Sequence, residues 1–233
     1  QACDATGADV VELARALGFD ERIGRLFLRA GIGFGGGCLP KDIRAFVARA
    51  EELGVREAVS FLEQVDAINR RRRDRVVALA ERCLGGSPEG ARVVVLGAAF
   101  KPDSDDIRDS PALEVARRLH ERGARVRVCD PRALDAVRRH HRGLETVREP
   151  LAALEDADLV LLLTEWNEFV RLDPDEAADR VATPVVIDGR NALDARRWRE
   201  AGWTHLGLGR PRLVPALRTR ALRRARSPRK VPR

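Results

Sequence analysis

The sequence predicts an α/β protein with an all-helical segment followed by a doubly wound parallel sheet. Residues 1–84 carry apolar residues mostly at helical spacing. After a turn-rich break at residues 85–90, short apolar runs alternate with helical segments, which is typical of parallel strands joined by crossover helices. The chain has 233 residues, 44% of them hydrophobic, so it is long enough to bury a core and hold two units.

The first helical region covers residues 7–30. Its first helix carries apolar residues at helical spacing, namely Val10, Leu13, Ala14 and Leu17. Gly18 is expected to end that stretch. We then expect a second short helix, which carries Ile23, Phe27 and Leu28 towards a glycine-rich loop.

Two longer helices are expected over residues 39–54 and 56–84. Each has an apolar stripe, formed by Ile43, Phe46, Val47 and Ala50 in the first and begun by Val59, Leu62, Val65, Ala67 and Ile68 in the second. A run of four arginines, Arg70 to Arg73, lies on the second helix. We interpret this run as a solvated helical face.

Four apolar runs predict buried parallel strands: Arg92–Gly97, Arg125–Cys129, Leu159–Leu163 and Val185–Asp188. Helical segments at 111–122, 132–141 and 167–171 or beyond separate them, and 151–156 forms a further helical turn. In a doubly wound sheet, ligand groups lie at the carboxyl ends of the strands.

We therefore expect a helical domain over residues 1–88, an α/β domain over 89–212 and a basic, disordered tail over 213–233. Ten lysines and arginines and no acid lie from Arg210 onward, so the net charge of +7 belongs to the tail, and the body is mildly acidic. A solvated tail is the simpler interpretation. A nucleic-acid-binding arm stays an alternative, since clustered arginine binds polyanions.

The four cysteines follow no metal-ligand or paired spacing: Cys3, Cys38, Cys83 and Cys129. The sequence also shows no signal peptide and no apolar run long enough to span a bilayer. We expect a cytoplasmic protein with neither a metal site nor a membrane partner.

Cys38 lies where a glycine-rich loop, residues 31–37, meets a predicted helix. Pro40 suits a first helical turn, and the positive end of a helix favours a thiolate, the reactive form of cysteine. Asp42 is four residues on, so its carboxylate is expected on the same side as the thiol. The spacing predicts a nucleophile with a base or water-orienting group; the alternative is a small buried filler.

Lys101, Arg108 and Arg190 all follow predicted strand ends. Taken singly, Lys101 and Arg108 are explained by ion pairs with nearby aspartates, and Arg190 by a turn bonded to Asp188. The loop after the first strand lacks the glycines of a dinucleotide fingerprint, and Asp130 lies too far beyond it for the usual ribose-binding acid. The sheet is therefore not expected to be a NAD site of its own.

Two blocks resemble signatures of the UDP-glucose/GDP-mannose dehydrogenase family: Gly-Ile-Gly-Phe-Gly-Gly-Gly-Cys-Leu-Pro-Lys-Asp at 31–42, and the Ala-Phe-Lys-Pro to Arg-Asp-Ser-Pro segment within 97–111. Three shorter matches follow in the family's order: Thr164–Trp166, Ile187–Asn191 and Gly207–Pro211. The resemblance spans residues 7–211. It implies a central helical dimerisation segment and a Rossmann-like UDP-sugar-binding domain.

The resemblance also implies an activity: NAD-dependent oxidation of the C6 alcohol of UDP-glucose to UDP-glucuronate. Cys38 would capture the aldehyde as a thiohemiacetal and hold the acid as a thioester, Asp42 would orient or deprotonate water, and Lys41 and Arg108 would contact the cofactor. Lys101 would also stabilise oxyanion charge. The implied substrate contacts are Arg22, Phe27, Leu28, Arg29, Ala30, Gly31, Gly35, Lys101 and Arg190. The residue matching Arg190 reaches a neighbouring subunit's sugar nucleotide, which implies a homodimer.

The chain departs from the family in three respects. It has no dinucleotide fingerprint near its start, and no positions match the family's catalytic glutamate or the lysine and asparagine of its central helix. We therefore expect a C-terminal portion, inactive on its own. Gly37 replaces a serine found in many members. UDP-glucose is preferred over GDP-mannose on residues 30–34; GDP-mannose 6-dehydrogenase activity and an inactive sugar-nucleotide-binding and dimerisation module are the alternatives.

Overall fold

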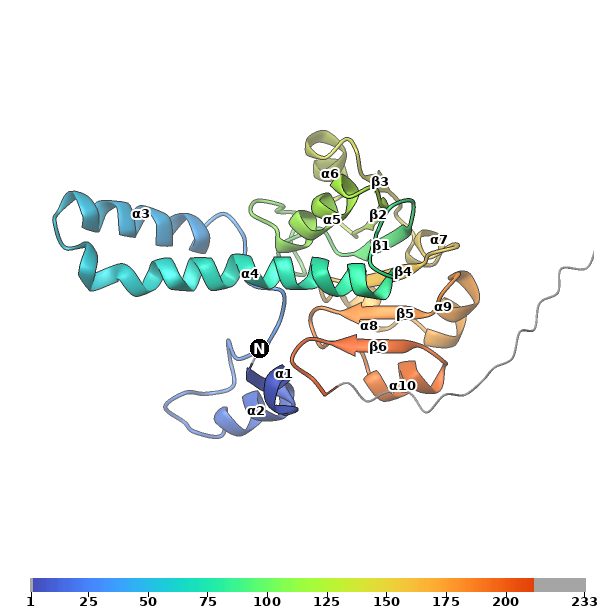
Figure 1. The fold of residues 1–233 in the computed structure, drawn as a ribbon, viewed down its shortest axis with the longest axis horizontal. Coiled ribbons are helices and arrows are strands. Elements are labelled where there is room, and N and C mark those ends of the chain that lie inside the picture. Colours follow the sequence, from blue (N-terminus) through green and yellow to red (C-terminus); the bar gives the residue numbers. More distant parts are fainter. Residues whose placement is uncertain (1, 212–233) are drawn as a thin grey trace, which may run out of the picture.

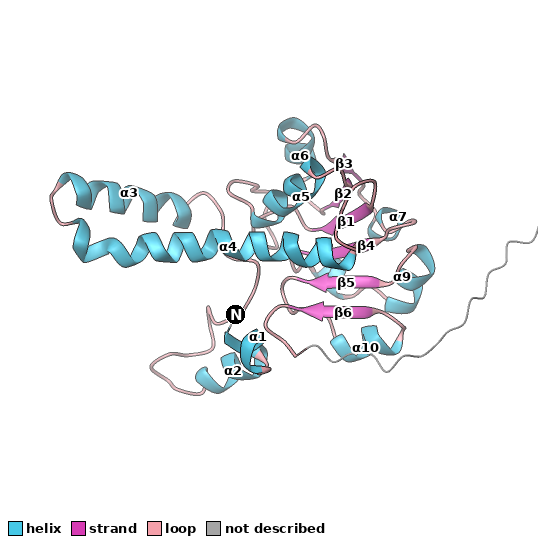
Figure 2. Ribbon diagram, viewed as in Figure 1, coloured by secondary structure: helices cyan, strands magenta, loops and turns pink. Residues whose placement is uncertain are grey.

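The structure, a computed structural model, describes residues 2–211, so the predicted tail at 213–233 lies outside the described residues. A helical part precedes a parallel sheet with flanking helices (Figure 1). Within residues 2–211 the strands lie only in the second part, after the turn at residues 85–90 (Figure 2). The predicted fold class is confirmed.

The described sheet has six parallel strands in the order β3-β2-β1-β4-β5-β6. They are β1 (Arg92–Leu96), β2 (Arg125–Cys129), β3 (Glu145–Thr146), β4 (Leu159–Leu162), β5 (Val185–Asp188) and β6 (Thr204–Gly207). This is the strand order of a doubly wound dinucleotide-type fold. The prediction missed the two edge strands, β3 and β6, because neither contains an apolar run.

The order reverses between β1 and β4, and the loops that follow these two strands meet. Gly97 has φ 103° and ends β1 so close to Thr164 that a β-carbon would stand 2.6 Å from the Thr164 nitrogen. The Thr164 hydroxyl donates to the Ala99 carbonyl at 2.7 Å. Ligands of such sheets bind at this switch point, outside the carboxyl ends of the strands.

Six helices accompany the sheet: α5 (Pro111–Glu121), α6 (Leu134–His140), α7 (Pro150–Ala153), α8 (Asn167–Val170), α9 (Pro174–Arg180) and α10 (Ala195–Glu200). Ser110 caps α5, since its hydroxyl accepts from the Leu113 N–H and donates to the Ala98 carbonyl at 2.6 Å. The cap ties the start of α5 to the loop after β1. The sequence predicted neither α9 nor α10.

The helical part contains α1 (Ala2–Thr6), α2 (Val10–Leu17), α3 (Leu39–Glu52), the 3₁₀ turn η1 (Arg56–Val59) and α4 (Ser60–Cys83). α3 and the first half of α4 form an arm that projects from the sheet, and the second half of α4 lies across the α/β part (Figure 1). Val76, Val77 and Ala80 on that second half are buried in the same core as the strands. The expected helices at 39–54 and 56–84 are confirmed.

The expected short helix through Ile23, Phe27 and Leu28 is wrong. After Gly18 closes α2, residues 19–27 form turns: the Asp20 carboxylate accepts from the Arg22 N–H at 3.0 Å, and Gly24 has φ 73°. An aspartate that bonds the backbone locally competes with helix formation. Phe27 itself has φ 63° and a fully exposed side chain.

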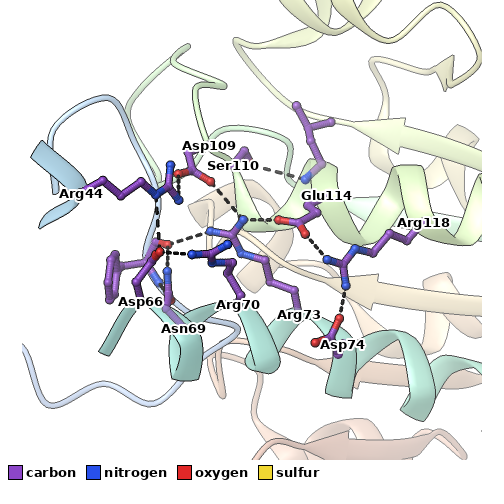
Figure 3. Close-up of polar contacts among 12 residues, drawn as sticks. Arg44, Asp66, Asn69, Arg70, Arg73, Asp74, Asp109, Ser110, Glu114 and Arg118 are labelled. Carbon is purple, nitrogen blue, oxygen red and sulfur yellow. Dashed lines mark hydrogen bonds and ion pairs between the residues drawn. The ribbon is translucent and has the colours of Figure 1, made fainter. Parts of the chain in front are cut away.

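The interpretation of Arg70 to Arg73 as a solvated face holds for Arg70 and Arg71, which are exposed, and is wrong for Arg72 and Arg73. Arg73 is only 3% exposed and pairs with Asp109 and Glu114 of the α/β part (Figure 3). Arg72 is half-buried, whereas Arg71 faces solvent. A helix turns by about 100° per residue, so four adjacent arginines point in different directions.

Candidate active site

Cys38 is the N-cap residue of α3, and it is exposed. Pro40 is buried in the first turn of this helix, and the Cys38 carbonyl accepts from the Asp42 N–H at 2.8 Å. The expected helix start at Cys38 is confirmed, and its exposure argues against a buried filler. The thiol lies at a helix N-terminus, where backbone N–H groups favour anions.

Lys41 and Asp42 follow in the first turn of α3, both exposed, with the Lys41 ammonium 3.3 Å from the Asp42 carboxylate. An exposed pair of this kind contributes little to stability. Both groups are therefore available to a ligand or a water molecule beside Cys38.

The glycine loop before Cys38 packs tightly on residues 108–111. The Gly36 N–H donates to the Arg108 carbonyl at 3.0 Å, and a β-carbon at Gly35 would stand 2.7 Å from Pro111 Cδ. Gly33 and Gly36 have φ 106° and 90°. The loop needs glycine for close approach at Gly35 and for positive φ at Gly33 and Gly36.

Arg108 lies at the thiol end of this loop. A β-carbon at Gly37 would stand 2.7 Å from its Nη1 and Nη2 atoms, so the guanidinium covers the residue next to Cys38. Its Nη2 donates to Asp106 at 2.7 Å, and this hydrogen bond lowers the pKa of the Asp106 carboxyl and raises that of Arg108. Arg108 is thus an ion-pair partner of an adjacent aspartate and also a cation beside the cysteine.

Lys101 lies on the same loop after β1. Its ammonium is 5.5 Å from the centroid of the Phe100 ring, and this ring contacts Gly36. Within residues 2–211 the Lys101 ammonium forms no ion pair, so the ion-pair alternative does not account for it. Lys101 is an exposed cation near the cysteine loop.

Arg190 follows β5 and is largely buried. Its Nε donates to the Leu163 carbonyl at 2.7 Å and lies 3.4 Å from the Glu165 carboxylate, while its backbone N–H donates to Asp188. Burial lowers the pKa of Arg190, and the charge of Glu165 opposes that effect. A β-carbon on Gly31 would stand 3.1 Å from Arg190 Nη1, so the cysteine loop begins against this side chain.

A cleft of about 600 Å³ opens beside Arg190. It lies between α2, the segment Leu28–Ala30 and the loops after β4 and β5, and Arg25, Arg29 and Glu165 add charged groups. The volume is within the range of small-molecule sites, about 300–1,000 Å³. Phe100 contacts both halves of the site, because its carbonyl accepts from Arg190 at 3.5 Å and its ring meets Gly36.

The structure brings together most of the residues singled out from the sequence. Leu28, Arg29, Ala30 and Arg190 line the cleft, and Gly31 packs against Arg190. The other members of the set lie in or around the Cys38 loop: Gly35, Lys41, Asp42, Lys101 and Arg108. Arg22 and Phe27 do not line the cleft. Arg22 is exposed and pairs with Asp20 at 2.6 Å.

Sequence reasoning missed Glu165 and Phe100. The signal for Glu165 was its position three residues after the end of β4, at the carboxyl edge of the sheet. Phe100 precedes Lys101 in the same loop, but an aromatic residue there is equally consistent with the core.

Asp130, considered from the sequence as a ribose-binding acid, is buried, and its carboxylate accepts hydrogen bonds from within the fold. Its carboxylate accepts from Ala98 and Ala99 N–H groups, at 2.7 and 3.0 Å, and from the Trp166 indole at 3.1 Å. Its other oxygen accepts from Ala133 at 2.8 Å. A carboxylate engaged in this way does not present a free oxygen to a ribose.

Two models of one family match this chain. The central domain of the UDP-glucose/GDP-mannose dehydrogenase family matches residues 1–71, and the UDP binding domain of the same family matches residues 94–195. The chain belongs to the UDP-glucose/GDP-mannose dehydrogenase family. The Cys38 loop thus falls in the family's central domain, and Lys101, Arg108 and Arg190 fall in its UDP binding domain.

Curated relatives and solved structures agree with this family assignment. UDP-glucose 6-dehydrogenases of Rhizobium meliloti and Pseudomonas aeruginosa are 38% and 37% identical over 90% of this chain and 47% of their own length. A UDP-glucose dehydrogenase structure from Pyrobaculum islandicum has a TM-score of 0.76 at 39% identity, over 88% of this chain and 45% of that one. The chain therefore spans about half the length of the relatives it matches.

None of the helices within residues 2–211 is long and apolar enough to cross a membrane. Over the same range, histidine, cysteine, aspartate and glutamate form no group of three or more that could hold a metal ion.

Proposed function

We propose that this protein takes part in the oxidation of UDP-glucose to UDP-glucuronate, with NAD as the oxidant and Cys38 as the nucleophile. The observation that carries the proposal is the exposed Cys38 at the start of α3, with Lys41 in the next turn and Arg108 against Gly37. A third cation, Lys101, lies over the Phe100 ring that contacts the loop at Gly36. The names of the relatives support UDP-glucose as the sugar nucleotide.

The cleft beside Arg190 is the proposed site for the nucleotide part of the substrate. A diphosphate carries negative charge, and Arg25, Arg29 and Arg190 supply cations around the cleft. The apolar side chains of Val10, Val11 and Leu28 supply walls of the kind found in ligand pockets. The hexose would extend along residues 31–37 towards Cys38.

In the proposed reaction, the C6 alcohol first gives up a hydride and a proton and becomes an aldehyde. The thiolate of Cys38 then adds to this aldehyde and forms a carbon–sulfur bond. The resulting thiohemiacetal loses a hydride and a proton to become a thioester, and water then hydrolyses the thioester and releases the acid. Asp42 is the proposed group that orients or deprotonates this water. Lys101 would stabilise the oxyanion formed when the thiolate or the water adds to the carbonyl carbon.

The residues around Cys38 suit NAD, whereas the start of the loop after β1 does not. Arg108 and Lys41 are exposed cations on either side of Cys38 and suit an anionic cofactor, so we propose that they contact it. The start of the loop after β1 does not offer backbone N–H groups for the cofactor's phosphates, because the N–H groups of Ala98 and Ala99 already donate to Asp130. When bound, the cofactor accepts the hydrides removed from the sugar, two for each acid formed.

We also propose that two copies of the chain associate through the arm formed by α3 and α4. The arm projects from the sheet (Figure 1) and exposes large apolar side chains: Phe46, Leu53, Val55, Phe61, Val65 and Ile68. Exposed apolar surface of this extent indicates a protein interface.

Calorimetric titration with UDP-glucose, GDP-mannose and UDP tests the proposal. Binding of UDP-glucose with GDP-mannose at least about tenfold weaker, a difference of about 1.4 kcal/mol, supports it. Binding without NAD reduction by the purified chain supports a binding and dimerisation module as the role of this polypeptide alone. Tighter binding of GDP-mannose would contradict the substrate assignment.

A further inference from the structure

The side-chain amide of Asn69, on α4, pairs with both backbone polar groups of Phe34 in the cysteine loop. Asn69 Oδ1 accepts from the Phe34 N–H at 2.8 Å, and Nδ2 donates to the Phe34 carbonyl at 2.9 Å. Asn69 is 4% exposed. This pairing resembles that between two strands, although one partner is a side chain, and it fixes both the position and the orientation of the Phe34 backbone.

Two further residues on the same side of α4 bind the loop. Arg72 donates from Nε and Nη2 to the Gly31 carbonyl at 3.3 and 3.2 Å, and Arg73 donates from Nη2 to the Phe34 carbonyl at 3.2 Å. Residues three and four apart lie on one face of a helix. α4 therefore holds the loop at Gly31, where it meets Arg190, and at Phe34, four residues before Cys38.

The loop needs such support, since five of the seven residues from Gly31 to Gly37 are glycine. Glycine loses more conformational freedom on ordering than any other residue. Gly33 lies so close to Asn69 that a β-carbon would stand 3.2 Å from the Asn69 carbonyl and overlap its side chain. Gly33 thus leaves no side chain in the loop where Asn69 of α4 approaches it.

The same face of α4 also binds the other two segments of the site: α3 through Asp66, which pairs with Arg44 at 3.5 Å, and the loop after β1 through Arg73. Arg73 pairs with Asp109 at 3.0 Å and with Glu114 of α5, and Arg44 of α3 pairs with the second oxygen of Asp109 at 3.2 Å (Figure 3). α3 carries Cys38, and Asp109 follows Arg108 in the loop after β1. The helix is a common support for the thiol, the loop and the cationic segment.

We propose that Asn69, Arg72 and Arg73, the α4 clamp, are positioning residues that hold the Cys38 loop against the sugar-nucleotide cleft. The inference rests on the proposed function, because it assigns the clamp a part in substrate binding. Its geometry is independent of that function. α4 belongs to the proposed dimer surface as far as Ile68 and the clamp follows along the helix, so one helix connects that surface with the cysteine loop.

Asn69→Leu tests the clamp, with Arg71→Ala as the matched control on the exposed side of the same helix. Two quantities are measured in the full chain: hydrogen exchange of the Phe34 amide and calorimetric affinity for UDP-glucose. In Asn69→Leu we expect the Phe34 amide to exchange at least about tenfold faster and UDP-glucose to bind at least about fivefold more weakly, the scale of losing two buried hydrogen bonds. Arg71→Ala changes neither.

Asn69→Asp and Arg72→Ala keep the test decisive if Asn69→Leu does not fold. Aspartate still accepts from the Phe34 N–H but cannot donate to its carbonyl, so Phe34 exchange stays slow while affinity falls. A role in stability alone lowers the thermal midpoint and leaves both readouts of the folded variant unchanged, which overturns the clamp. If the wild-type chain binds no UDP-glucose, the proposed function fails, whereas the clamp is still judged by amide exchange over residues 31–38.

Discussion

The guanidinium group of Arg108 lies directly against Gly37, the residue before Cys38. A β-carbon on Gly37 would stand 2.7 Å from each of its terminal nitrogens. Asp106 holds the guanidinium in place with hydrogen bonds from Nε and Nη2. A cation is thus fixed beside the thiol without any covalent or metal constraint, and the bare backbone of Gly37 makes room for it.

Alanine at Gly35 and at Gly37 should have different effects on stability. A β-carbon at Gly35 meets the backbone carbonyl of Asp109 and the ring of Pro111, which cannot move cheaply, so we expect a loss of about 1–3 kcal/mol in the free energy of unfolding. A β-carbon at Gly37 meets only the end of a flexible arginine, and we expect a loss below about 1 kcal/mol. Urea unfolding measures both; equal losses would contradict the packing described.

Arg190→Lys should weaken UDP-glucose binding by at least about tenfold, because lysine lacks the forked donors that reach the Leu163 carbonyl and a diphosphate. Arg139→Ala is the control, since Arg139 is exposed on α6, outside the cleft. Calorimetry of the two folded variants gives the comparison. An unchanged dissociation constant for Arg190→Lys would show that the nucleotide binds elsewhere.

Asp66 should contribute to stability only above acidic pH. Burial alone would raise the pKa of this carboxyl, but hydrogen bonds and positive charge from Arg70 and Arg44 outweigh burial and lower it. A carboxyl with a lowered folded-state pKa stabilises the protein above its unfolded pKa, about 3.9, and this contribution disappears as the pH falls through the folded value.

Asp66→Asn is therefore expected to be less stable than wild type by about 1–3 kcal/mol at pH 6–8. The difference should shrink below about pH 4, where the wild-type carboxyl takes up its proton. Thermal unfolding from pH 2.5 to 8 measures it. A difference that stays constant across this range would contradict the ion-pair network in Figure 3.

The cysteines should differ sharply in reactivity. Burial, with Asp130 and Glu149 nearby, raises the pKa of Cys129 to about 12, so its thiolate is scarce at neutral pH. Cys38 is exposed. Iodoacetamide at pH 7.5 should label Cys38 in the folded chain and Cys129 only after denaturation, as measured by peptide mass spectrometry. Equal labelling of the two in the folded chain would contradict the structure.

An aspartate on the outer arm should prevent association of two copies. Phe61 and Ile68 are 61% and 49% exposed on α4, so a charge at either position costs little in a single folded chain and much in an apolar interface. We expect Phe61→Asp and Ile68→Asp to sediment as monomers and wild type as a dimer. Wild-type monomers at micromolar concentration would contradict the proposed interface.

The strands that the sequence predicted are the inner strands of the described sheet. β1, β4 and β5 each carry a run of apolar residues and β2 buries Val126, Val128 and Cys129 alongside two arginines, whereas β6 carries Thr204, His205 and Leu206 at a sheet edge. A strand paired on one side only needs fewer apolar residues, so its pattern is weak. β3 has two residues, too few for any pattern.

The cysteine loop was predictable because its chemistry is local, with glycines, a helix start and a carboxylate within twelve residues. The role of α4 was not. Arg73 and Asp109 are 36 positions apart, and Asn69 and Phe34 are 35 apart, so neither partnership leaves a trace in local spacing. Arg72 and Arg73, in a run of arginines that resembles a solvated surface in the sequence, are instead buried or half-buried and join α4 to the cysteine loop.

Protection of Cys38 by UDP-glucose tests the central claim, that a sugar nucleotide binds with its hexose at this thiol. The rate of iodoacetamide labelling of Cys38 is measured with saturating UDP-glucose, with saturating UDP and with no ligand. The predicted result is slower labelling with UDP-glucose, by about tenfold or more, and clearly less protection with UDP, which lacks the hexose. An equal labelling rate in all three samples, with UDP-glucose binding demonstrated by calorimetry, would contradict it.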